Sequence, residues 1–291
     1  MRILVTNDDG VDSVGIQLLA RALHADSRFD VSVVAPDRDY SGVGASLGGA
    51  RPDDLRGRAV ELPEAPGVEA WAVNAPPAMC VLAGRLEGFG DPPDVVVSGI
   101  NAGLNTGRAI LHSGTVGAAL TAQNFGLSAL AVSLQEGEQW RWDTAVRVAM
   151  DVMDLLLDAP ARSVLNLNVP NCDYADVAGT RWARLAPFGE VRMALTPRDA
   201  PATTGSGTER SLVAELQLTE VDFDPDTDTG LVRSGFAALT TLVGVAEAWP
   251  DATAPTAEAI EQQLVPGASL DPAHRVPDAN TQGTLRRPQI G

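Results

Sequence analysis

Residues 1–10 read Met-Arg-Ile-Leu-Val-Thr-Asn-Asp-Asp-Gly, a short apolar strand that runs directly into a turn with two carboxylates. Because the strand occupies the first residues, we expect it in the centre of a sheet, with Asn7 and the residues after it marking its carboxyl end. Ligands bind at that edge of open α/β sheets. Adjacent strand side chains point to opposite faces, so Asp8 and Asp9 can converge on one ion only after the chain bends, which Gly10 permits.

The segments that follow alternate strand patterns with helix patterns. Residues 16–24 carry apolar side chains at helical spacing, residues 31–35 form a second apolar run, and residues 95–97 are consecutive valines, as in a strand covered on both faces. Such alternation predicts an α/β fold whose parallel strands are joined by right-handed crossovers. Further strands are predicted at 68–73, at 127–134 and, as the last of the main sheet, at 164–169, and further helices at 77–86, 116–124 and 140–157.

The pattern changes near residue 173. The following segment contains short strand-like pieces separated by turns, of which 211–218 and 236–242 are predicted to leave the main sheet, and a short helix is predicted at 256–264. Residues 266–291 are rich in proline, arginine and polar side chains and have few core residues, so we expect disorder there. The chain is thereby divided into a core at 1–172, a β-rich extension at 173–265 and a tail at 266–291.

The composition narrows the choice of partners. The 291 residues include 21 basic side chains, all arginine, against 38 acidic ones, and the net charge of −17 argues against a surface that binds duplex nucleic acid. A small-molecule partner is more consistent with that charge, and the absence of lysine removes any mechanism that needs one. No apolar run approaches the roughly 18 residues of a membrane span, and the chain begins with a strand instead of a leader peptide. We therefore expect a cytoplasmic protein with no membrane partner.

Polar loops that follow three predicted strands are expected to meet at one edge of the sheet. Together with the start of the next helix they offer carboxylate, hydroxyl and amide groups from Asp8, Asp9, Ser41, Asn101 and the run Ser113-Gly114-Thr115. Such oxygens suit a hard divalent ion, Mg²⁺, Mn²⁺ or Ca²⁺, and amides at a helix start suit a phosphate. They predict a phosphoryl group held between a metal and backbone N–H donors, with the metal neutralising charge and activating water. The ion and the amides would also supply the positive potential that an acidic protein lacks.

Each piece of this site also has a plainer interpretation. An Asp-Asp-Gly run after a strand is commonly a turn, and Ser113 or Thr115 could be the capping residue of a helix. His112 could act as an acid or base near the site, although a single histidine is more often structural. Trp140 and Trp142 begin an amphipathic helix and fit a core or an interface better than a stacking platform.

Four ordered motifs in the first half of the chain are specific enough to compare with known families. They are Ile-Leu-Val-Thr-Asn-Asp-Asp-Gly at 3–10, Val-Val-Ala-Pro-Asp-Arg-Asp-Tyr-Ser-Gly at 33–42, Val-Val-Val-Ser-Gly-Ile-Asn-Ala-Gly-Leu-Asn-Thr-Gly at 95–107 and Ser-Gly-Thr-Val at 113–116. In this order and spacing they resemble the SurE family of survival-protein nucleotidases. The resemblance covers residues 1–134 and continues weakly at 165–170, at Thr227-Asp228 and at 235–242.

The resemblance implies a divalent-metal-dependent phosphatase that acts on nucleoside 5′- and 3′-monophosphates, with some members also trimming short polyphosphate. The implied fold is a Rossmann-like α/β core of three layers with a carboxy-terminal β-rich extension that assembles a homodimer or homotetramer. One divalent ion per subunit, Mg²⁺ or Mn²⁺, is implied. The residues that carry over are the metal ligands Asp8, Asp9, Ser41 and Asn101, the phosphate contacts Gly42, Asn101, Ser113, Gly114 and Thr115, and the catalytic residues Asp8, Asp9 and Asn101.

The chain also departs from the family pattern around these residues. Asp12-Ser13-Val14 stands where a histidine and an Ala-Pro pair are usual, Met79 and Arg108-Ala109 replace acidic positions, His112 replaces a tyrosine and Thr121 a glutamate. The metal ligands are intact, whereas the surroundings of the substrate are altered. The alternative is therefore a protein diverted to a specialised phosphorylated metabolite, or one that binds metal and nucleotide without turnover. The attacking group is water, which we favour, or the carboxylate of Asp8 or Asp9.

Two other classes with acidic or phosphate-binding loops are excluded. A response-regulator receiver also carries paired acids after its first strand, but it needs a lysine, and this chain has none and is over twice the usual receiver length. A dinucleotide-binding dehydrogenase needs a glycine-rich loop after its first strand, where this chain has Asp8-Asp9-Gly10.

Overall fold

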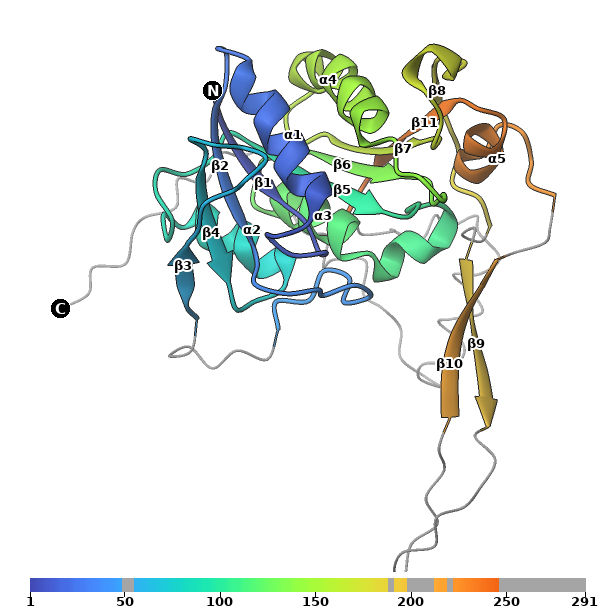
Figure 1. The fold of residues 1–291 in the computed structure, drawn as a ribbon, viewed down its shortest axis with the longest axis horizontal. Helices are drawn as coiled ribbons and strands as arrows, with labels where there is room; N and C mark the ends of the chain where they lie inside the picture. Colours follow the sequence, from blue (N-terminus) through green and yellow to red (C-terminus); the bar gives the residue numbers. More distant parts are fainter. Residues whose placement is uncertain (49–54, 188–190, 198–211, 219–221, 246–291) are drawn as a thin grey trace, which may run out of the picture. The chain divides into compact units, whose positions relative to one another are not determined.

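Strands and helices alternate along the computed structural model, which describes residues 1–48, 55–187, 191–197, 212–218 and 222–245 (Figure 1). The strands are β1 (Arg2–Thr6), β2 (Asp30–Pro36), β3 (Gly57–Ala59), β4 (Glu69–Val73), β5 (Val95–Ala102), β6 (Ser128–Leu134), β7 (Val164–Val169), β8 (Thr180–Trp182), β9 (Val191–Pro197), β10 (Leu212–Leu218) and β11 (Ala237–Leu242). The α-helices are α1 (Val14–Ala25), α2 (Pro77–Arg85), α3 (Gly114–Asn124), α4 (Trp142–Asp158) and α5 (Asp228–Arg233), and two 3₁₀ helices are η1 (Gly107–His112) and η2 (Tyr174–Asp176).

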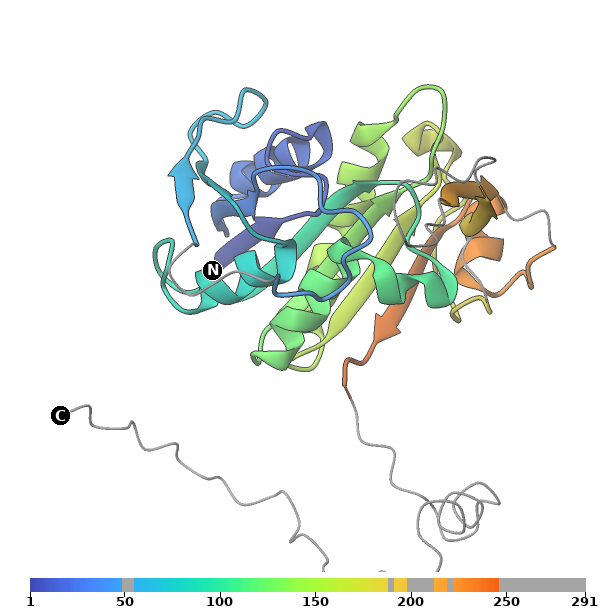
Figure 2. The ribbon, with the colours of Figure 1, turned by 90° about the horizontal axis from the view of Figure 1, so that it is seen from below.

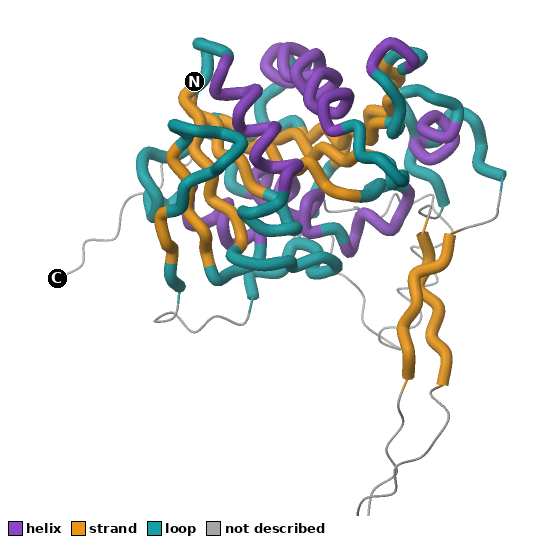
Figure 3. Tube along the Cα trace, viewed as in Figure 1, coloured by secondary structure: helices purple, strands orange, loops and turns teal. Residues whose placement is uncertain are grey.

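A nine-stranded sheet lies between two helical layers. Helices α1 and α4 cover one face and α2 and α3 the other (Figures 1 and 2). The alternation of side chains on β1 serves both layers, because Ile3 and Val5 pack with α1 and α4 while Leu4 packs with α2 and α3. Figure 3 shows the same arrangement as a row of strands flanked by helices. The predicted α/β class and the Rossmann-like three-layer core are confirmed.

The order of the strands places β1 in the interior of the sheet. The order is β3-β4-β2-β1-β5-β6-β7-β11-β8, and β1 pairs in parallel with β2 on one side and with β5 on the other. The chain thus builds outward from β1 in one direction and then returns to build in the other, which makes the carboxyl ends of β1 and β5 a topological switch point. Such points are the usual ligand sites of open α/β sheets.

Two expectations about the edge of the sheet are wrong. The strand at 164–169 is not the last of the main sheet, and the strand at 236–242 does not leave it, because β11 pairs antiparallel with β7 over five residue pairs, from Ala238↔Asn168 to Leu242↔Val164. β8 then adds in parallel to β11. The physical reason is that β7 would otherwise present unpaired backbone groups, and an added strand satisfies them.

The second part of the chain is described only in places. Strand 211–218 is confirmed as β10, which pairs antiparallel with β9 in a separate two-stranded sheet. The helix predicted at 256–264 and the tail at 266–291 lie outside the described residues. Within the described residues, no helix combines the length and the apolar character that crossing a membrane requires.

Candidate functional site

The loops that follow β1, β2 and β5 meet at the carboxyl edge of the sheet, as the sequence predicts. β1 ends beside β5, with Thr6 paired to Ser98. The loop after β2 folds back onto the loop after β1, where the Tyr40 N–H donates to the Asp8 carbonyl oxygen at 2.8 Å. Three segments that are distant in the sequence therefore form one polar surface at the switch point.

Asp8 is buried against the amino-terminal end of α3. The residue is 3% exposed, and the Thr115 hydroxyl donates to its Oδ1 atom. A Cβ atom added at Gly114 would lie only 2.7 Å from Asp8 Oδ2, so glycine is required for this approach. Burial raises the pKa of Asp8, while the Thr115 hydroxyl and the backbone groups of Thr115 and Gly114 lower it in part. The helix start thus stabilises a carboxylate that the fold has removed from water.

Asp9 is less buried and lacks a partner for one oxygen. Within the described residues, its Oδ2 atom is shielded from solvent and has no hydrogen-bond partner. Burial, followed by the charge of Asp8 and, more weakly, that of Asp39, raises the pKa of Asp9 to about 6, although the Ala102 backbone opposes the shift. Two neighbouring carboxylates that are both desolvated create a strong demand for a cation.

Asn101 is brought to the same place by β5. Its Nδ2 atom donates to the Gly103 carbonyl oxygen at 2.7 Å, which fixes the orientation of the amide. The Asn101 Oδ1 atom lies 3.4 Å from the Thr115 hydroxyl oxygen, on the side of Asp8. Asp8, Asn101 and Thr115 therefore form one cluster, in which Asn101 presents an oxygen.

Ser41 is exposed on the loop after β2. Its N–H and its hydroxyl both donate to Asp39 Oδ1, each at 2.7 Å. Within the described part of the chain, no hydrogen bond joins Ser41 to Asp8, Asp9 or Asn101. Ser41 therefore stands on a neighbouring loop without direct contact to the rest of the predicted ligand set.

The donor set contains only oxygen atoms. Its carboxylate, amide and hydroxyl oxygens are those that hard divalent ions prefer. The Asp9 Oδ2 atom has no hydrogen-bond partner among the described residues, and the Asp8 carboxylate lies against the start of α3 at Gly114. No group of three or more His, Cys, Asp and Glu side chains converges in the described residues. A cation at this edge would therefore depend on amide and hydroxyl oxygens as well as on the two carboxylates.

The other predicted residues have more local roles. The Ser113 hydroxyl accepts from the Val116 N–H at 3.1 Å, so the plainer interpretation of Ser113 as the cap of α3 is correct. The Thr121 hydroxyl donates to the Gly117 carbonyl inside α3. His112 is exposed, and its carbonyl oxygen accepts from the Gly44 N–H at 3.0 Å. Trp140 and Trp142 stack with ring centroids 5.0 Å apart and pack against the core, as expected.

One residue that organises the site region was missed from the sequence. Asp228, at the start of α5, is fully buried and accepts from the N–H groups of Gly107, Ala186 and Thr229 at 2.7–2.9 Å. It thereby fixes the end of the loop that begins at Asn101. In the sequence, Asp228 is noted only as part of the weak motif Thr227-Asp228, and that motif does not predict hydrogen bonds to three backbone N–H groups.

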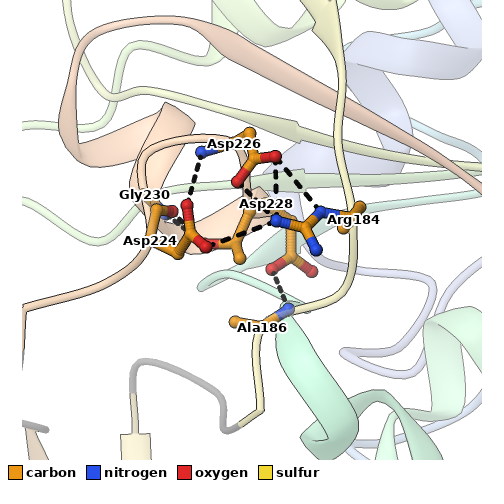
Figure 4. Close-up of polar contacts among 7 residues, drawn as sticks. Arg184, Ala186, Asp224, Asp226, Asp228 and Gly230 are labelled. Carbon is orange, nitrogen blue, oxygen red and sulfur yellow. Dashed lines mark hydrogen bonds and ion pairs between the residues drawn. The ribbon is translucent and has the colours of Figure 1, made fainter.

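The acidic residues that precede Asp228 are used differently. In Figure 4 the Arg184 guanidinium faces Asp224 and Asp226, at 3.3 and 2.8 Å, whereas Asp228 is turned toward the Ala186 N–H. The first two carboxylates thus form an exposed ion pair with Arg184. Only Asp228 contributes to the buried framework.

The fold and the site together define a class: a Rossmann-like α/β protein with two desolvated carboxylates at its switch point, of which Asp8 lies against the start of a helix. Residues 3–189 match the family model described as survival protein SurE, and the chain belongs to the SurE family.

Its relatives cover most of the chain. The 5'/3'-nucleotidase SurE of Proteus mirabilis is 39% identical over 248 residues, which cover 83% of this chain and 89% of that protein. The 5'-nucleotidase SurE of Xanthomonas campestris is 38% identical over 266 residues, covering 84% and 95%. The crystal structure of the SurE protein from Aquifex aeolicus is similar with a TM-score of 0.68 and 29% identity, covering 84% of this chain and 93% of that one.

Proposed function

We propose that the protein is a divalent-metal-dependent phosphomonoesterase that hydrolyses nucleoside 5′- or 3′-monophosphates to nucleoside and phosphate. The nucleotidase relatives support the reaction class. The observation that carries the proposal is the pair Asp8 and Asp9, desolvated together at the switch point with one oxygen left unpaired. Such a pair is costly in a folded protein unless it serves a cation.

Four oxygen donors are proposed to hold one Mg²⁺ or Mn²⁺ ion per subunit, namely Asp8, Asp9, Ser41 and Asn101. When bound, the ion would neutralise phosphate charge and activate a water molecule. Asp8 and Asn101 are already oriented by Thr115 and by the Gly103 carbonyl. The site would therefore need little rearrangement to bind the ion.

The phosphate is proposed to lie between these donors and the start of α3, in contact with Gly42, Asn101, Ser113, Gly114 and Thr115. The amino-terminal end of a helix carries positive potential, which favours an anion. Ser113 accepts from Val116 through its oxygen and keeps its own hydroxyl proton for a phosphate oxygen.

Water is proposed as the attacking group, in line with the leaving oxygen. Asp8 is an unsuitable nucleophile because the Thr115 hydroxyl occupies its Oδ1 atom and the backbone of α3 stabilises its charge. Asp8, Asp9 and Asn101 then act as the catalytic residues by holding the reacting groups, and the chain itself supplies orientation rather than a covalent intermediate.

The test compares Asp9→Asn and Asn101→Ala with the unmodified protein. We expect Mg²⁺- or Mn²⁺-dependent hydrolysis of nitrophenyl phosphate and of AMP to be lost in both variants. Asp158→Asn is the control, because Asp158 is an exposed acid at the end of α4 and lies outside the site loops. Full activity in either site variant would show the assignment to be wrong.

A second candidate function is favoured by two residues near the site that differ from the usual residues of the family. Arg108 and His112 are exposed on η1, next to the start of α3, where the family usually has acidic and tyrosine side chains. An added positive charge at this edge favours an ester with an extra anionic group. A panel of phosphate esters assayed with Mg²⁺, Mn²⁺ and Co²⁺ separates the functions: release from nucleotides supports the first, release from one unusual ester supports diversion, and metal binding without release supports a protein without turnover.

We further propose a cytoplasmic homodimer or homotetramer, assembled through the β-rich extension at 173–265, with the core at 1–172 holding the site. The antiparallel pair β9–β10, which is separate from the main sheet, supports this role for the extension. Sedimentation of the full chain should give the mass of a dimer or tetramer, and replacing residues 191–218 by a short glycine-serine linker should lower it. A monomeric full chain would refute the assembly.

A further inference from the structure

The side chain that holds Ser41 belongs to Asp39, two residues earlier on the same loop. A single oxygen, Asp39 Oδ1, accepts from both the N–H and the hydroxyl of Ser41 at 2.7 Å. Within the described residues Asp39 forms no ion pair, since its neighbour Arg38 pairs with Asp37 and lies over the Tyr40 ring. The Asp39 carboxylate is therefore committed to Ser41.

The direction of that hydrogen bond matters for a metal ligand. A serine hydroxyl has one proton and two lone pairs, and it can coordinate a cation only through a lone pair. Because the proton of Ser41 points to Asp39, the lone pairs are left for another partner. A hydrogen bond to a charged acceptor is stronger than one to a neutral acceptor, so the Asp39 carboxylate holds the Ser41 hydroxyl firmly in this orientation.

Asp39 also accepts from the Ser41 N–H, but the loop backbone on either side of Ser41 is held by contacts that do not involve the Asp39 side chain. The Tyr40 N–H donates to the Asp8 carbonyl and the Gly44 N–H donates to the His112 carbonyl. Gly44 also packs so closely on α3 that a Cβ atom added at Gly117 would lie 2.5 Å from its carbonyl carbon. These contacts do not involve the Ser41 hydroxyl, whose orientation is given by its hydrogen bond to Asp39.

We propose that Asp39 is a positioning residue that orients the Ser41 hydroxyl for coordination of the divalent ion. This role rests on the proposed function, because it presumes that Ser41 is a ligand. Asp39 acts through Ser41 and is not itself a ligand, in agreement with the absence of a three-acid cluster among the described residues.

The test measures Mn²⁺ dissociation constants by calorimetry on metal-stripped protein. Asp39→Ala should weaken binding about 10-fold or more, in the range seen when outer partners of metal ligands are removed. Asp39→Asn should weaken it less, because its amide oxygen still accepts from Ser41. Ser41→Ala should weaken it at least as much as Asp39→Ala, and the double variant should be no weaker than Ser41→Ala alone.

Asp37→Asn is the matched control, since it removes the same charge from the same loop and should bind Mn²⁺ as the unmodified protein does. The thermal midpoint of the metal-free protein should be the same in all variants, because Asp39 and Ser41 are exposed. Unchanged affinity in Asp39→Ala, or losses that add in the double variant, would overturn the role of Asp39 alone. Failure of the unmodified protein to bind Mn²⁺ would overturn the proposed metal-dependent function as well.

Discussion

Replacing Gly117 by alanine tests whether the contact between α3 and the Ser41 loop sets the geometry of the site. The added Cβ would lie 2.5 Å from the carbonyl carbon and oxygen of Gly44 and 2.6 Å from Ala45 N, whereas ordinary contact begins near 3.4 Å. The loop must therefore retreat by about 0.9 Å, the difference between 3.4 and 2.5 Å. Overpacking of this kind costs about 1–3 kcal/mol. Replacing glycine by alanine inside a helix stabilises the folded state by about 1 kcal/mol through helix propensity.

The two terms nearly cancel, so the free energy of unfolding should fall by only about 0–2 kcal/mol. A displacement of about 1 Å can cost roughly 100-fold in rate, and we expect a loss of that order in kcat/KM for Mn²⁺-dependent phosphate release. Scanning calorimetry and steady-state kinetics on the same preparation separate the two effects. Asn124→Ala is the control, because it improves helix propensity at the exposed end of α3 without adding an atom near the loop.

Two results would refute this reasoning. If Gly117→Ala keeps the unmodified kcat/KM, the loop accommodates the methyl group without moving Ser41. If its thermal midpoint collapses together with the activity, the contact stabilises the whole fold and does not specifically position the loop.

Three further predictions concern the buried carboxyl groups. Thr115→Val removes the hydroxyl donor of Asp8 and should cost about 1–3 kcal/mol of unfolding free energy in urea, while Thr115→Ser should restore most of it. Asp228→Ala leaves three buried N–H groups without an acceptor and should cost about 3 kcal/mol or more, whereas removing the exposed Asp226 should leave the urea midpoint nearly unchanged. In the metal-free protein the pKa of Asp9 is raised from 3.8 to about 6, so its contribution to stability is full below pH 3.8 and is lost as the pH rises through 6. Because the cation competes with that proton, Mn²⁺ affinity should increase over the same interval and then level off in calorimetric titrations; a flat profile would contradict the shift.

Local patterns were sufficient for the central part of the fold. The apolar runs of β1, β2, β5 and β6 are short and bounded by turn residues, so each can be recognised as a strand from its own sequence, without knowing which strand it pairs with. The pairing of β11 with β7 depends on contacts between residues about seventy positions apart, and no local pattern records it. β3 and β8 have only three residues each and pack too little apolar surface to give a signal.

The site was predictable to the extent that its residues follow strands. Asp8, Asn101 and Thr115 come together because parallel strands bring their carboxyl ends to one edge. Asp39 could have been noticed as an Asp two residues before a Ser, a spacing that favours a local turn bond. Asp228 could not, because its partners are the backbone N–H groups of its neighbour Thr229 and of two distant residues, and a backbone donor carries no residue identity.

The interior position of β1 has a consequence for the order in which the chain assembles. β1 precedes its partner strands in the chain, and β2 can pair with it early, but the Arg2 N–H must wait for Asp94, 92 residues further on, and Asp8 must wait for Thr115. Contacts of such long separation form slowly. Until then the burial that raises the pKa of Asp8 and of Asp9 is incomplete. We therefore expect a nascent chain to bind its cation only after β5 and α3 have docked. The ion would then stabilise the completed sheet and would not nucleate its folding.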